Sequence, residues 1–246
     1  CVENGRRFGG LDGDAGVGTH GGSEDHAAIV QGRPGHVSAF AFVPPRAIDN
    51  ARVSERWRFV LAPSGAAARK TGAAQEPYNR LASGAATLLA LWNTQSHVPP
   101  AVSIGAVLAS GDRAADQLRA LAKASSVPGW PADALQRRLD HFVREDARVP
   151  RALAAFRAVD AEALRTLSVE SQADAETLLG NQVRETIALA RAALDLGACA
   201  ACSFGAGFGG SVWALVERDR APAFARRWRR DAFVASPGLP LTRLDA

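Results

Sequence analysis

The chain has 246 residues, of which 47% are hydrophobic and 22% are charged, and its formal net charge is +4. This balance excludes a disordered polyelectrolyte, and the length allows a substantial core in one large domain or two small ones. No apolar run approaches the length of a membrane span and no signal-peptide pattern opens the chain, so we expect a soluble, cytoplasmic protein. The absence of methionine and the start at Cys1 predict a fragment or a processed product.

The first informative stretch is residues 18–26, which read GTHGGSEDH and precede an apolar run. Its glycines allow a tight turn, and Ser23 is a suitable N-cap for a helix over residues 24–31. Asp25 then lies in the first helical turn, where a carboxylate can accept a proton from a substrate hydroxyl or orient it. From spacing alone, a solvated capping acid in a surface loop explains the pattern at least as well.

The next part of the chain predicts two strands and a helix. Alternating apolar residues over 37–43 indicate a strand, which follows a turn signal at 32–35 and ends at Pro44 and Pro45. A polar connection leads to a second strand at 57–62, and a helix follows from residue 71 to about residue 92. A helix and two strands in close succession favour a mixed α+β fold.

From residue 106 onward the sequence predicts mainly helices that serve packing. The run at 128–131 interrupts them, and a helix then places Leu135 and Leu139 on one face. Pro150 is expected at the start of a further helix, where its missing N–H is tolerated. Two more helices are predicted, one over 183–194 that ends at Gly197 and a final one over 221–233.

A second glycine-rich stretch lies directly before an apolar strand at 212–216. It contains four glycines within six residues: Gly205, Gly207, Gly209 and Gly210. Backbone amides in such a loop can approach a phosphate or a second loop closely. Because the loop lacks the strand-then-helix context of a dinucleotide fingerprint, its glycines alone do not name a ligand.

Three other patterns carry no function. Lys70 and Thr71 end like a phosphate-binding P-loop, but Ser64 and Arg69 stand where that fingerprint requires glycine. The arginines at 226–230 are expected to form a solvated helix face, so no nucleic-acid partner is predicted. Cys199 and Cys202 have redox-motif spacing, but they follow a helix instead of opening one, which favours two small buried residues.

The two glycine-rich motifs, their order and separation, and the intervening Tyr78-Asn79-Arg80 together closely resemble the galactokinase branch of the GHMP small-molecule kinases. The likeness covers essentially the whole chain. It implies a two-lobed α+β fold with the active site in the cleft. Residues 1–65 would be the C-terminal part of the N-terminal lobe, and residues 66–246 would be a helix-rich, ferredoxin-like C-terminal domain.

The resemblance also assigns roles to individual residues. Asp25 falls at the position of the family's catalytic aspartate, and Gly22 and Tyr78 match residues that contact the sugar. The four glycines of the second motif correspond to a loop that braces the family's phosphate-binding loop and borders the substrate. In this context Asp25 becomes the strongest catalytic candidate.

The implied reaction transfers the γ-phosphoryl group of ATP, with Mg²⁺, to the anomeric hydroxyl of galactose or a related sugar. Asp25 would act as a general base or as an ionised group that orients the hydroxyl. The family's N-terminal sugar-gripping segment and its Ser/Gly-rich phosphate loop do not occur in these 246 residues, so we expect the fragment to be inactive alone. Ser23-Glu24 and His26 depart from the family pattern, which leaves the particular sugar open.

Two alternatives stay open at this stage. A non-catalytic sugar-binding regulatory protein could use the same scaffold. A metal-dependent enzyme could use His20, Asp25 and His26, but adjacent helical residues point apart and no third well-spaced ligand is evident, so we predict no metal site. No membrane partner is expected, and incomplete sheet edges predict some tendency to associate.

Overall fold

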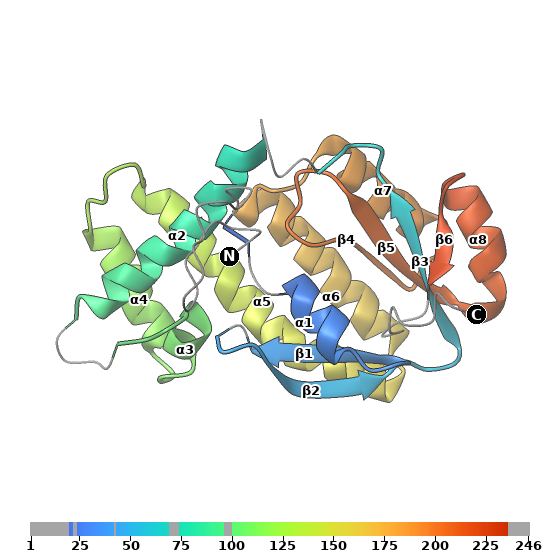
Figure 1. Ribbon diagram of the computed structural model, residues 1–246, viewed down its shortest axis with the longest axis horizontal. Helices are drawn as coiled ribbons and strands as arrows, with labels where there is room; N and C mark the ends of the chain where they lie inside the picture. Colours follow the sequence, from blue (N-terminus) through green and yellow to red (C-terminus); the bar gives the residue numbers. More distant parts are fainter. Residues whose placement is uncertain (1–19, 22–23, 42, 69–73, 96–99, 236–246) are drawn as a thin grey trace. The chain divides into compact units, whose positions relative to one another are not determined.

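A computed structural model describes residues 20–21, 24–41, 43–68, 74–95 and 100–235. The chain divides into two compact units, each assembled from separate stretches of sequence (Figure 1). The first unit comprises Cys1–Gly22 and Arg69–Ala147, and the second comprises Ser23–Ala68 and Arg148–Ala246. The division between Ala147 and Arg148 falls inside one helix, α5 (Ala132–Ala158).

The second unit is built on a four-stranded antiparallel sheet. Its strands are β3 (Trp57–Pro63), β4 (Ala200–Ser203), β5 (Ser211–Glu217) and β6 (Phe233–Ala235), in the spatial order β4-β5-β3-β6. Helices α6 (Ala161–Asp174), α7 (Arg184–Asp195) and α8 (Ala221–Trp228) belong to the same unit, with a π-helical turn η2 (Ala175–Leu179) directly after α6 (Figure 1). A short 3-10 turn, η3 (Arg218–Arg220), connects β5 to α8.

Each face of this sheet is covered, because side chains alternate along its strands. On one face Val60, Val212 and Ala214 pack with residues of α7 and α8, and Val60 and Val212 are fully buried. On the other face Trp57 and Leu215 pack with residues of α6 and of the end of α5. The continuous apolar run that predicted the strand at 212–216 is therefore a strand buried on both faces.

The second unit also contains a two-stranded antiparallel sheet of β1 (His36–Ala41) and β2 (Arg46–Arg52), together with α1 (Glu24–Gln31). Helix α1 buries only Ala27 and leaves Ile29 and Val30 60% and 79% exposed. The helix predicted over 24–31 is confirmed. The cap predicted at Ser23 lies outside the described residues.

The first unit is helical within the residues that the structure describes. Its helices are α2 (Gln75–Asn93), α3 (Ile104–Leu108), α4 (Ala114–Ala124) and the first part of α5. They enclose a separate core in which Leu88, Leu118, Leu135 and Leu139 are fully buried. Leu135 and Leu139 share one face of α5, as predicted.

Three sequence-based predictions about elements are wrong. The polar connection before residue 57 contains strand β2, which pairs with β1 in register from Arg52 opposite His36 to Arg46 opposite Ala41. Pro150 lies inside the continuous helix α5, on an exposed position, and does not begin a new helix. The last predicted helix ends at Trp228, and residues 233–235 form β6, because they pair with β3.

The α+β class predicted from the sequence is confirmed. The lobe boundary predicted between residues 65 and 66 stays a prediction, although β3 pairs along its whole length with β5, a strand from the far end of the chain. None of the helices in the described part of the chain is long and apolar enough to cross a membrane.

Candidate active site

Asp25 lies in the first turn of α1, beside Glu24, and is exposed. Two acidic side chains at this end of a helix interact favourably with the partial positive charge of its N-terminus. At this exposed position Asp25 can reach a substrate from the solvent, and the charge of its carboxylate is not buried. Gly22, the predicted sugar-contacting glycine, lies outside the described residues.

The four glycines of the second motif lie in one loop, which connects the antiparallel strands β4 and β5. All four have positive φ angles, namely 57° at Gly205, 81° at Gly207, 122° at Gly209 and 87° at Gly210. Phe208, between two of them, also has a positive φ of 59°. Only glycine adopts such angles at little cost, so the glycine-rich composition is a requirement of this loop's backbone.

One side of the glycine loop is held by the segment that follows β3. The Gly210 amide donates to the Ala66 carbonyl at 2.8 Å, and the Ser64 amide donates to the Gly210 carbonyl at 2.8 Å. A Cβ atom built on Gly209 would lie 2.6 Å from the Ala66 carbonyl oxygen. Close approach to a second backbone, which the sequence allowed as one use of these glycines, is therefore present at Gly209.

The opposite side of the loop is held by Asn181, which is 2% exposed. The Phe208 amide donates to the Asn181 carbonyl at 2.6 Å, and the Asn181 side-chain amide donates to the Ala206 carbonyl at 2.9 Å. A Cβ atom on Gly207 would lie 2.3 Å from the Asn181 carbonyl oxygen. The loop is thus fixed from two sides.

One amide of this loop belongs to an exposed residue and is available for a ligand. Within the described part of the chain, the backbone N–H groups of Gly205, Gly207 and Gly209 form no hydrogen bond, but Gly205 is exposed whereas Gly207 and Gly209 are buried. A run of backbone amides in residues with positive φ is a common way to bind anionic or hydroxyl oxygens. The loop can therefore donate to a ligand while its own shape is held by other contacts.

Tyr78 belongs to the first unit, whereas Asp25 and the glycine loop belong to the second. It lies in the first turns of α2 and is half-buried. The neighbouring Asn79 accepts a hydrogen bond from the His20 amide at 2.8 Å, which ties the start of α2 to the first glycine-rich motif. The guanidinium of Arg80 lies 4.5 Å from the centre of the Trp130 ring and donates to the Gly129 carbonyl.

The metal and redox alternatives gain no support. Among the described residues no group of three or more His, Cys, Asp or Glu side chains could hold a metal ion, so His20, Asp25 and His26 do not form such a site. Burial raises the pKa of the Cys199 thiol, and the nearby Glu217 carboxylate raises this pKa further, so the reactive thiolate is disfavoured. Cys202 is buried in the sheet.

Sequence reasoning missed Asn181 and the contact between the glycine loop and Ala66. Gly180 has a left-handed backbone with a φ of 69° and ends the π-helical turn before Asn181. A glycine followed by asparagine after a helical run is a usable stop signal. Nothing in the local sequence, however, indicates that Asn181 contacts a loop some 25 residues later.

Comparisons with known proteins agree with this architecture. Residues 152–235 match the family of GHMP kinases C terminal. Over 112 residues the chain is 34% identical to the galactokinase of Thermococcus kodakarensis, a match that covers 42% of this chain and 32% of that protein. The crystal structure of Lactococcus lactis galactokinase complexed with galactose matches with a TM-score of 0.68 and 21% identity, over 96% of this chain and 56% of that one.

Residues 152–235 are thus similar to the C-terminal part of GHMP kinases, and the α+β fold is similar to that of a solved galactokinase. The sequence likeness to the Thermococcus galactokinase extends over 112 residues of this chain. The chain spans about a third of the curated relative and about half of the solved structure that it matches.

Proposed function

We propose that the protein to which this chain belongs is an ATP-dependent sugar kinase of the galactokinase type. It would transfer the γ-phosphoryl group of ATP to the anomeric hydroxyl of galactose or a closely related sugar. The observation that carries the proposal is the 34% identity to a galactokinase over 112 residues. The exposed Asp25 on a helix N-terminus and a rigid loop with an available amide at Gly205 supply chemistry that suits this reaction.

In this proposal Asp25 faces the sugar hydroxyl. A carboxylate there accepts the proton of the attacking hydroxyl or holds the hydroxyl in line with the γ-phosphorus. Because phosphoryl transfer passes through a loose transition state, positioning contributes much of the rate and an early proton transfer is not required. Gly22 and Tyr78 would contribute to the sugar pocket.

The glycine loop would lie beside the substrates in the same proposal. The exposed Gly205 would offer an amide donor to a phosphate oxygen or a sugar hydroxyl, while Gly210 joins the loop to the segment after β3. The close approach to Ala66 shows that this loop can brace another backbone segment, which is the role that we propose for it toward the phosphate-binding loop. Fixed donors need no reorganisation during the reaction, which favours catalysis.

ATP and Mg²⁺ are the proposed cofactors. The described residues offer no cluster of carboxylate or histidine ligands for the ion, so we assign Mg²⁺ no ligand from them and derive no step through it. ATP phosphates supply most of the ligands that Mg²⁺ prefers when it enters such a reaction.

The test uses this chain and a longer form that carries sequence upstream of Cys1, each with Asp25 intact or changed to alanine. We expect the longer form to release ADP in the presence of galactose, and Asp25→Ala to abolish turnover while nucleotide still raises the melting temperature. Loss of nucleotide binding in Asp25→Ala would contradict the role given to Asp25. A thermal response to sugar without any response to nucleotide would instead support a non-catalytic sugar-binding protein.

A further inference from the structure

The segment that holds the tip of the glycine loop is residues 180–183, between η2 and α7. On one side the π-helical turn fixes it, because the amides of Gly180 and Asn181 both donate to the Ala175 carbonyl, at 2.9 and 3.3 Å. π-Helical turns are rare and often occur at functional sites. The segment leaves the turn through the left-handed Gly180.

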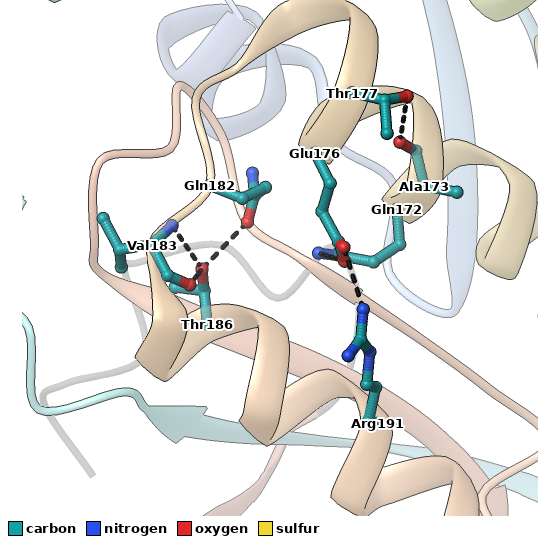
Figure 2. Close-up of polar contacts among 8 residues, drawn as sticks. All are labelled: Gln172, Ala173, Glu176, Thr177, Gln182, Val183, Thr186 and Arg191. Atoms are coloured by element: carbon teal, nitrogen blue, oxygen red, sulfur yellow. Dashed lines mark hydrogen bonds and ion pairs between the residues drawn. The ribbon is translucent and has the colours of Figure 1, made fainter.

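On its other side the segment is fixed by Thr186 of α7, as Figure 2 shows. The Val183 amide donates to the Thr186 hydroxyl oxygen at 3.2 Å, and the hydroxyl lies 2.9 Å from both Gln182 Oε1 and the Val183 carbonyl oxygen. Thr186 is fully buried, so no water replaces these contacts when the hydroxyl is removed. The hydroxyl has one hydrogen, which it can donate to Gln182 Oε1 or to the Val183 carbonyl oxygen.

From Gln182 the contacts continue in one direction to the glycine loop. Gln182 Nε2 donates to Asn181 Oδ1 at 2.9 Å, and Asn181 Nδ2 donates to the Ala206 carbonyl at 2.9 Å. A side-chain amide has a donor end and an acceptor end, so a partner at one end decides what the other end offers. When the Thr186 hydroxyl donates to Gln182 Oε1, Gln182 presents its Nε2 donor to Asn181, and Asn181 presents its Nδ2 donor to the loop.

We propose that Asn181 is a positioning residue for the glycine loop and that its amide is oriented by the relay from Thr186 through Gln182. The proposal rests on the proposed function, in which the exposed Gly205 amide of the loop contacts a substrate. With Asn181 reversed, its Oδ1 would face the Ala206 carbonyl oxygen, and two acceptors would repel. The part of the loop around Ala206 would then shift, although the bond from the Phe208 amide to the Asn181 carbonyl remains, and the neighbouring Gly205 amide would lose its fixed direction.

The entrance of the loop is held independently, so a change in the relay need not unfold the sheet. The Ser203 amide donates to Gln172 Oε1 at 2.9 Å, and Gln172 Nε2 donates to Glu176 at 3.1 Å. Glu176 in turn pairs with Arg191 of α7 at 3.0 Å (Figure 2). The two contact sets share no hydrogen bond, and of the two only the relay contacts Ala206.

The experiment compares Thr186→Val with Thr186→Ser, which keeps the hydroxyl. The matched control is Thr177→Val, since the Thr177 hydroxyl donates to Ala173 in the neighbouring turn and is exposed (Figure 2). Gln182→Glu is a second variant that removes the donor facing Asn181 but leaves Thr186 intact. All are made in the longer form with upstream sequence, and kcat, KM and amide hydrogen exchange of residues 204–210 are measured.

We expect Thr186→Val and Gln182→Glu to lower kcat about tenfold or more through lost alignment, with a smaller effect on KM for the sugar. Both variants should exchange loop amides faster than wild type, whereas Thr186→Ser and Thr177→Val should resemble wild type. Equal loop exchange and equal kcat in Gln182→Glu and wild type would overturn the relay, even if Thr186→Val fails to fold. Absence of kinase activity in wild type would refute the proposed function, while the exchange data would still decide the positioning role.

Discussion

Alanine at Gly207 is the sharpest test of how tightly the glycine loop is held. A Cβ atom there would lie 2.3 Å from the Asn181 carbonyl oxygen and 2.5 Å from Asn181 Nδ2. Gly205 provides the matched control, because its φ of +57° is also left-handed but nothing lies within 4 Å of its Cβ position. Both variants place alanine in a backbone region that costs about 1–2 kcal/mol.

The difference between the two variants isolates the steric overlap at Gly207. Overpacking of this kind typically costs about 1–3 kcal/mol. For a chain of this size, about 1 kcal/mol lowers the melting temperature by about 2–4 °C. Gly207→Ala should therefore melt roughly 2–12 °C below Gly205→Ala, measured by thermal unfolding followed by circular dichroism. Equal melting temperatures would refute the close contact between Gly207 and Asn181.

Two further predictions concern other parts of the chain. Gly84→Ala in α2 should lower the stability of the first unit, because the added Cβ atom would lie 2.8 Å from the Trp130 ring. Alanine normally favours a helix over glycine, so a gain in stability in urea unfolding would contradict this contact. A hydrogen bond from the Arg157 guanidinium lowers the pKa of Asp49 from its ordinary value of 3.8. The pair therefore stabilises the fold at a pH above 3.8, and this stabilisation is lost as the pH falls through the lowered pKa. Asp49→Asn should therefore lower the stability at pH 7 but not in acid. Added salt should reduce this loss, because the pair is exposed. A stability difference that does not change with pH would exclude the ion pair as the cause of the loss.

Local sequence determined those elements whose signals lie within a few residues. The helix at 24–31, the strand at 57–62 and the buried strand at 212–216 were predicted because turn residues bound apolar runs of the right period. The glycine pattern also predicted a loop that can approach a phosphate or a second loop closely, and the structure shows close approach to another backbone at Gly209. The assignments of Gly22, Asp25 and Tyr78 to the site came from family resemblance and stay predictions.

Only the tertiary structure decided the features that depend on distant partners. Strand β2 is polar and largely exposed, so its conformation follows from pairing with β1 and not from its own composition. Strand β6 exists because Phe233–Ala235 pairs with β3, more than 170 residues earlier in the chain. Asn181 contacts the glycine loop for the same reason: folding brings together residues between which the sequence contains no local signal. Periodicity and turn chemistry report the burial and backbone angles of single elements, whereas pairing and support of a loop are set by which elements pack together.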